Sequence, residues 1–350
     1  MDGLVAAVKD PIGAASSALL STVSATAGWR LGFSHHAVDL LVPAAAGDTQ
    51  GRSVTMRYLE RGPTDAPFPL VMIPGFTAEV TAYYTTVKKL GLPPTARVII
   101  IEIPGQGGSR LAPTPPWTDF LSESEMVAAM GVLIQRLGVT PARRADILGF
   151  SLGGGLAVGL CKDHGELFRK RVLVAPGIRQ CIDAQWLELA STRPKEVHCF
   201  ETFEELKGAY AGHAIDFHPH RLPPDFLLRG MAFQRRLYGE GYFIAMMVAL
   251  WGEALTVADD EDRGGDSMDD VRAVLSSAAA DTVIIIGDRD RCINPAAVAD
   301  LAAAAGVRCV LLKDVGHVGG PADRPWPETM FSLMAPPAAA HLLGASSAKL

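Results

Sequence analysis

The chain has 350 residues, of which 49% are hydrophobic and 20% are charged. This composition is that of a globular protein with a sizeable core, and it excludes a disordered chain. The formal net charge is −6 and no long run of Lys or Arg occurs, which argues against a nucleic-acid-binding face.

The cysteines favour a reducing, intracellular compartment. Their number is odd and none forms a Cys-x-x-Cys pair, so neither a disulfide framework nor a zinc site is expected. They are Cys161, Cys181, Cys199, Cys292 and Cys309.

Residues 1–32 are interpreted as a leader that forms a frayed or surface-lying helix. The stretch Ile12–Trp29 lacks charge, but its many Ser, Ala, Gly and Thr residues make it a weak membrane span. The first ten residues lack the basic start of a signal peptide, although Ala25-Thr26-Ala27 leaves secretion as a minor alternative. Two interpretations stay open: a packed or disordered leader, or a helix whose apolar face contacts a membrane.

From about residue 33, strand-like and helix-like segments alternate, which predicts an α/β protein. His35 and His36 are assigned to an early strand. Further strands are predicted at Val54–Leu59, Leu70–Ile73, Val98–Ile103, Ala145–Phe150, Arg171–Val174, Thr282–Ile286 and Val307–Leu312. Helices are predicted at Ser122–Leu137, Leu152–Lys162 and Ala296–Ala305. Several strands are apolar at nearly every position, which predicts a mostly parallel sheet covered by helices on both faces.

The alternation fails between residues 178 and 275, where helical patterns dominate. We therefore predict a helical cap at 178–275, inserted into a core formed by 33–177 and 276–337, with a flexible tail at 338–350. Within the cap, His218 and His220 lack a third metal ligand and indicate a surface turn. The acidic run Asp259–Asp266 has the wrong spacing for a calcium loop and is interpreted as a solvated linker.

A candidate nucleophile lies between a predicted strand and a predicted helix. Gly149-Phe150-Ser151-Leu152-Gly153 has the pattern G-x-S-x-G. A serine on such a sharp turn is raised above the sheet, and the flanking glycines allow neighbouring segments to pass close to it. Ser151 is therefore the predicted nucleophile.

A serine hydroxyl needs a base, and the base needs a carboxylate to orient it. Two acids, Asp288 and Asp290, follow the strand Thr282–Ile286, at the end of a strand where such sheets place active-site groups. Asp290 is the preferred acid and Asp288 the alternative. Of the two histidines that follow, His341 lies in an Ala/Pro-rich tail, so His317, beside Gly316, is the predicted base.

Two further segments make a family resemblance specific. Ile73-Pro74-Gly75-Phe76-Thr77 looks like the oxyanion loop of α/β-hydrolases, and Glu102–Ser109 resembles their D-x-P-G-x-G-x-S segment. Together with Ser151, the acid loop and His317, the match extends over residues 52 to 335. The sequence is thus similar to the α/β-hydrolase superfamily, whose fold has a mostly parallel sheet flanked by helices and, in some branches, a helical cap.

The resemblance implies an oxyanion hole formed by the backbone N–H groups of Phe76 and Leu152. Pro74 stands where the family usually has histidine, and Glu102 where it usually has aspartate. The segments Pro74–Ala78, Val174–Gln180 and 202–242 most resemble the monoacylglycerol lipase-like branch.

The predicted function is hydrolysis of a carboxylic ester through an acyl-enzyme, with a lipid ester such as a monoacylglycerol as substrate and without metal or organic cofactor. The dense apolar run Phe243–Trp251 either lines an acyl-chain pocket or packs a buried cap helix. Thioester or carbon–carbon bond hydrolysis on the same triad, and a receptor that binds a small ligand without turnover, are the alternatives. The final Ala348-Lys349-Leu350 resembles a peroxisomal address. The alternative is a cytoplasmic location, or a membrane-associated one through contact of the leader or the cap.

Overall fold

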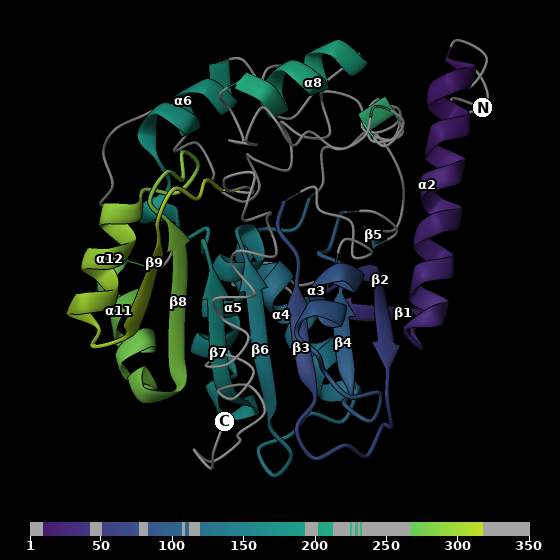
Figure 1. The fold of residues 1–350 in the computed structure, drawn as a ribbon. Coiled ribbons are helices and arrows are strands. Elements are labelled where there is room, and N and C mark those ends of the chain that lie inside the picture. The colour runs from purple at the N-terminus through teal and green to yellow at the C-terminus, as the bar shows by residue number, and fades with distance from the viewer. Residues whose placement is uncertain are drawn as a thin grey trace.

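The computed structural model describes residues 10–42, 51–76, 83–106, 109–111, 120–192, 202–212, 225, 228–229, 232 and 267–317. The centre of the molecule is one sheet in the order β1-β2-β4-β3-β6-β7-β8-β9, with β5 paired to β2 (Figure 1). The strands are β1 (Ser34–Val42), β2 (Arg52–Arg61), β3 (Leu70–Ile73), β4 (Val98–Ile101), β5 (Arg110–Leu111), β6 (Ala145–Phe150), β7 (Phe168–Val174), β8 (Thr282–Gly287) and β9 (Arg308–Leu312).

The strands β4, β3, β6, β7, β8 and β9 are neighbours in that order and run parallel. The strand β2 pairs with β1, β4 and β5 in antiparallel fashion. Every residue of β3, β4, β6 and β8 is buried. Such continuous burial explains why these strands are apolar along nearly their whole length, because helices cover both faces of the sheet. The predicted α/β class is confirmed.

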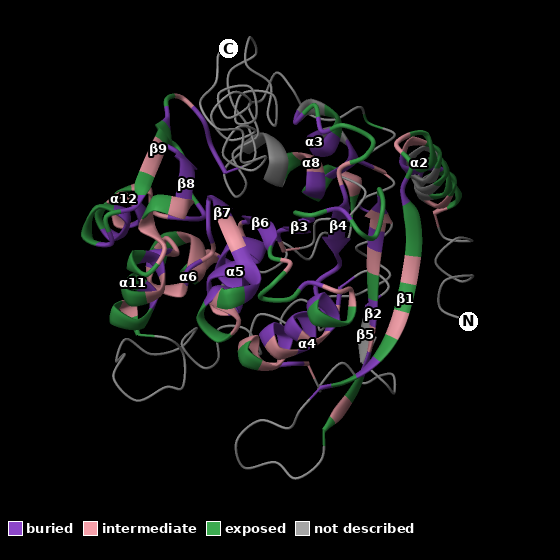
Figure 2. Cartoon of the chain, turned by 90° about the horizontal axis from the view of Figure 1, so that it is seen from below, coloured by how far each residue is buried: buried purple, intermediate pink, exposed green. Residues whose placement is uncertain are grey.

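Helices lie on both faces of this sheet. Figure 2 shows α4 (Glu123–Arg136), α5 (Leu152–Asp163) and α11 (Met268–Ser276) along one face and α3 (Tyr83–Lys89) on the other. The start of α4 is fixed by a capping box between Ser122 and Glu125, and that of α12 (Pro295–Ala304) by the side chain of Asn294. These caps determine the residue at which each helix begins.

The leader contains a helix, α2 (Pro11–Arg30), which runs beside the β1 edge (Figure 1). Its Gly28 lies so close to Tyr84 that a Cβ would be 2.3 Å from the Tyr84 hydroxyl, so this end of α2 is docked on the core. Trp29 is 76% exposed. Among the described helices, none is both long and apolar enough to cross a membrane. Membrane contact stays a prediction.

Two described helices of the predicted cap, α6 (Ala184–Thr192) and α8 (Phe203–Gly212), lie beyond the carboxyl ends of the parallel strands (Figure 1). The helix α11, part of which was assigned to the cap, packs against α5 and α12. The domain limits themselves stay a prediction. His218, His220, Asp259–Asp266, Phe243–Trp251 and residues 318–350, with His341 and Ala348–Leu350, lie outside the described residues.

Candidate active site

Ser151 occupies a strained turn between β6 and α5. Its backbone has φ 52° and ψ −123°, in a region that residues with a side chain rarely adopt. A Cβ at Gly149 would lie 2.3 Å from the Gly153 carbonyl oxygen, and one at Gly153 would lie 2.2 Å from that of Pro74. Both glycines of the pattern are therefore required for the chain to pass here, and they keep the end of β3 against the serine turn.

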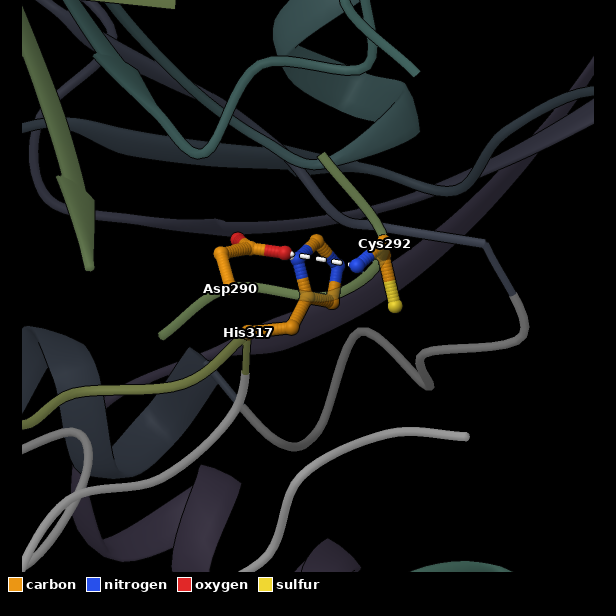
Figure 3. A group of neighbouring side chains, drawn as sticks. All are labelled: Asp290, Cys292 and His317. Carbon is orange, nitrogen blue, oxygen red and sulfur yellow. Dashed lines mark hydrogen bonds and ion pairs between the residues drawn. The ribbon is translucent and has the colours of Figure 1, made fainter. Parts of the chain in front are cut away.

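The side chains of Ser151, His317 and Asp290 form a continuous hydrogen-bonded chain. The distance from His317 Nε2 to Ser151 Oγ is 3.0 Å, and that from His317 Nδ1 to Asp290 Oδ2 is 2.8 Å. Asp290 and His317 are buried, and they face each other across the loops that carry them (Figure 3). Because a carboxylate only accepts, Nδ1–H donates to Asp290, which leaves the Nε2 lone pair to accept the Ser151 hydroxyl proton.

The carboxylate of Asp290 is held by its own loop. Its Oδ1 accepts hydrogen bonds from the backbone N–H groups of Cys292 and Ile293, at 2.9 and 2.8 Å. The alternative acid, Asp288, is exposed, and its Oδ1 accepts from the backbone N–H of Val315 at 3.3 Å. Asp290 thus contacts the histidine, whereas Asp288 stabilises the loop that carries His317.

The loop between β9 and His317 is tied to the acid loop in several ways. The Arg289 N–H donates to the Val315 carbonyl at 3.0 Å, and the Arg289 side chain forms an ion pair with Asp314 at 2.5 Å. A Cβ at Gly287 would lie 2.0 Å from that Val315 carbonyl oxygen, so the two loops pass in direct contact. The imidazole also packs on the Phe150 ring, with centroids 5.3 Å apart. These contacts position His317 over Ser151.

The predicted oxyanion-hole residues come from two segments that meet at the serine. Phe76 follows β3, and a Cβ at the preceding Gly75 would lie 3.1 Å from Ser151 Cβ. Leu152 is the first residue of α5, where a backbone N–H has no acceptor within the helix. The N-terminal end of α5 also carries positive partial charge, which favours a developing oxyanion.

Tyr83 supports the turn between β3 and Phe76, a role that the sequence analysis did not predict. Its hydroxyl is buried and donates to the Ile73 carbonyl at 3.4 Å, while the Gly75 N–H donates to the hydroxyl. Burial raises the pKa of Tyr83 strongly, and the Gly75 N–H offsets only part of this rise, so the hydroxyl stays protonated. One side chain therefore connects the end of β3 with the predicted oxyanion turn.

The two departures from the family pattern have different structural settings. Glu102 is buried, and its Oε2 accepts the Ser109 N–H at 2.9 Å. Ser109 Oγ in turn donates to the Glu102 carbonyl and accepts the Arg57 N–H at 2.8 Å. The glutamate thus closes the turn after β4. Pro74, which lacks a side-chain hydrogen-bonding group, lies in contact with Gly153 through its carbonyl oxygen.

One group of described side chains could hold a metal ion. The ligand atoms of Asp290, Cys292 and His317 lie within 4.8 Å of one another, and all three residues are buried (Figure 3). The sequence predicted no metal site, and the position of the Cys292 thiol was not recognised.

Most of the sequence matches the model of one protein family, in agreement with the sheet and the site. Residues 70–329 match the model of the alpha/beta hydrolase family. The chain belongs to the alpha/beta hydrolase family. Its mostly parallel sheet with flanking helices is the fold of that family, as predicted.

Solved structures of other alpha/beta hydrolases resemble the chain over nearly its whole length. A protein designated a lipase from Acinetobacter baumannii AYE has a TM-score of 0.66 at 18% identity, covering 93% of this chain and 95% of its own. A meta-cleavage product hydrolase from Pseudomonas fluorescens IP01 has a TM-score of 0.63 at 18% identity, with coverage of 88% and 98%.

Carboxylesterase CesB from Bacillus subtilis has a TM-score of 0.58 at 13% identity, covering 95% of this chain and 99% of its own. At these identities the similarity concerns the fold alone. No curated protein sequence matches the chain. The finer resemblance to the monoacylglycerol lipase-like branch gains no specific support.

Proposed function

We propose that the protein is a serine hydrolase that cleaves carboxylic esters through an acyl-enzyme. The observation that carries this proposal is the hydrogen-bonded chain Ser151–His317–Asp290, built on a strained turn at the carboxyl edge of the sheet. Three residues far apart in the sequence meet in the order that the proposed roles of nucleophile, base and orienting acid require.

In the proposed reaction, Ser151 Oγ attacks the ester carbonyl while His317 Nε2 takes its proton. Asp290 holds the proton on Nδ1 and stabilises the imidazolium that forms. The imidazolium then protonates the leaving alcohol. A water molecule, deprotonated by His317, hydrolyses the acyl-enzyme and frees Ser151.

The backbone N–H groups of Phe76 and Leu152 are the proposed donors to the oxyanion. Both segments lie beside Ser151, and donors of this kind contribute about 3 kcal/mol each to the lowering of the barrier. The α5 N-terminus adds its positive partial charge at the same place. None of these steps requires a metal or an organic cofactor.

We propose a lipid ester, such as a monoacylglycerol, as the substrate. Two observations on known proteins are consistent with an ester: a lipase and a carboxylesterase share the fold. Carbon–carbon bond hydrolysis is the second candidate, because a meta-cleavage product hydrolase has a comparable TM-score.

A substrate panel tests the proposal. Purified protein and Ser151→Ala would be compared on monoacylglycerols of several chain lengths, on simple esters, on acyl-CoA thioesters and on a meta-cleavage dienoate. We expect ester hydrolysis that Ser151→Ala abolishes. Faster turnover of the dienoate or of the thioesters would assign the triad to that reaction instead. Tight ligand binding without turnover of any substrate would favour a receptor.

A further inference from the structure

The thiol of Cys292 lies beside the acid–base pair and takes no part in the proposed hydrolysis. Cys292 belongs to the loop between β8 and α12 and forms no disulfide. Its sulfur, one Asp290 carboxylate oxygen and one His317 ring nitrogen lie within 4.8 Å of one another, and each residue is at most 7% exposed. Figure 3 shows the three side chains gathered at one point between the two loops.

The chemistry of these three groups fits a thiophilic divalent cation. Thiolate, imidazole and carboxylate are the ligands of Zn²⁺, which takes four ligands at about 2.0–2.3 Å. Such bonds place ligand atoms about 3.3–3.8 Å apart. Ligand atoms 4.8 Å apart would need to close by about 1 Å, whereas Asp290 Oδ2 and His317 Nδ1, 2.8 Å apart, would need to open slightly. Water can complete the fourth position.

Charge explains why the cysteine matters. A Zn²⁺ ion with one carboxylate and a neutral imidazole would leave a net positive charge in a buried site, which is costly. A Cys292 thiolate brings the net charge of the ion and its ligands to zero. On binding, the thiol loses its proton to solvent and a metal–sulfur bond forms, with no change of oxidation state.

We propose that Asp290, Cys292 and His317 form an inhibitory Zn²⁺ site within the catalytic centre. This regulation rests on the proposed hydrolase function, but the metal binding itself does not. A metal on Nδ1 forces the ring proton onto Nε2, which can then no longer accept the Ser151 proton. A metal on Nε2 occupies that lone pair directly. Either arrangement removes the general base.

Metal binding is tested first, in a background where catalysis plays no part. Zn²⁺ affinity and stoichiometry are measured by competition with a chromogenic chelator for Ser151→Ala and for Ser151→Ala combined with Cys292→Ala or Cys292→Ser. We expect Cys292→Ala and Cys292→Ser each to abolish Zn²⁺ binding at one site or to weaken it at least about tenfold. Loss of a residue that only hydrogen-bonds to a metal ligand already lowers metal affinity by about that factor. Thermal unfolding of each variant confirms that it is folded.

The matched control is Cys309→Ser. Cys309 is a half-buried thiol on β9, where it pairs with Ile284 of β8, and it is not part of the Asp290–Cys292–His317 group. In the Ser151→Ala background, this substitution should leave Zn²⁺ affinity and stoichiometry unchanged. Equal Zn²⁺ binding with and without the Cys292 thiol, in folded variants, overturns the proposal.

Inhibition is measured second, as the fall in ester hydrolysis when Zn²⁺ is added to chelator-treated protein. Each variant is normalised to its own metal-free rate. We expect the inhibitory concentration to rise at least about tenfold in Cys292→Ser and to stay the same in Cys309→Ser. An unchanged inhibitory concentration in Cys292→Ser overturns the inhibitory role. If no substrate is turned over, the proposed function fails, while the binding experiment still decides whether the metal site exists.

Discussion

The parallel and antiparallel parts of the sheet differ in what they contribute to the site. In the parallel part, the loops after β3, β6, β8 and β9 carry Phe76, Ser151, Asp290 and His317 in turn. At the antiparallel edge, β1 and β2 contain many exposed or half-buried residues and carry none of the predicted site residues. Parallel strands bring all their carboxyl ends to one edge, whereas antiparallel neighbours place them at opposite edges. The site is therefore a consequence of strand direction, and substitutions should matter most where parallel strands end.

The largest effect is expected at the acid. In Asp290→Asn the amide can no longer hold the proton on Nδ1, so kcat should fall by about 10⁴-fold with a folded protein. Asp288→Asn is the matched control, because Asp288 contacts the backbone of Val315 and not the imidazole. Its kcat should fall by less than about tenfold. Equal losses in the two variants would show that the hydrogen bond to Asp290 is not the one that matters.

Asp146 lies near the start of β6, at the other end of the strand from Ser151. Its substitution should change the stability of the protein without changing kcat. Asp146 is buried, and its carboxylate accepts two hydrogen bonds from Arg169, at 2.9 and 2.7 Å. Burial raises the pKa of Asp146 to about 6, although Arg169 offsets part of the rise. The folded state thus binds the proton more tightly than the unfolded state, so the contribution of Asp146 to stability is largest below about pH 4 and declines through about pH 6.

Asp146→Asn removes this titration. As the pH rises from 4 to 7, the wild type should lose up to about 3 kcal/mol of unfolding free energy relative to Asp146→Asn. Denaturant unfolding at several pH values measures this, while kcat at pH 7 should be unchanged. A difference that does not vary with pH would contradict the assignment.

A smaller effect on catalysis is expected at Tyr83. Tyr83→Phe removes the hydroxyl that connects Ile73 with Gly75, so the turn carrying Phe76 loses a restraint. We expect kcat to fall about tenfold with little change in KM, because the oxyanion is present only in the transition state. Tyr84→Phe is the control on the same helix, since its hydroxyl contacts His35 at 3.2 Å. If Tyr83→Phe changes kcat no more than Tyr84→Phe does, Tyr83 has no positioning role.

The smallest effect is expected at the antiparallel edge. Thr55 lies opposite Asp39 and donates a hydrogen bond to its carboxylate at 2.6 Å, in an exposed cross-strand pair. Thr55→Ala should lower the unfolding free energy by about 0.5 kcal/mol or less and leave kcat unchanged. A loss of activity in this variant would mean that the edge is coupled to the site.

The sequence predicted best those elements that are apolar throughout. Strands β3 and β6 were predicted residue for residue, because both are buried throughout and only Asp146 interrupts their apolar residues. β7 begins at Phe168, three residues before the predicted Arg171, since Arg169 and Lys170 are only half-buried and interrupt the pattern. β5 has two residues, too few to show any periodicity.

The same distinction holds within the site. Ser151, Asp290 and His317 could be chosen because each follows a recognisable strand, and the hydrogen bonds join the three that were chosen. Tyr83 was missed because its role depends on a tertiary contact back to Ile73, which no local pattern records. The closeness of the Cys292 thiol to His317 likewise arises from how two distant loops meet.

Activation of Ser151 by His317 can be measured with an active-site label. A fluorophosphonate probe reacts with a serine whose proton is taken by a base, and mass spectrometry locates the modified residue. We expect rapid labelling at Ser151 in the wild type, with labelling lost in Ser151→Ala and greatly slowed in folded His317→Ala. Labelling at another residue, or equal labelling rates with and without the His317 imidazole, would contradict it.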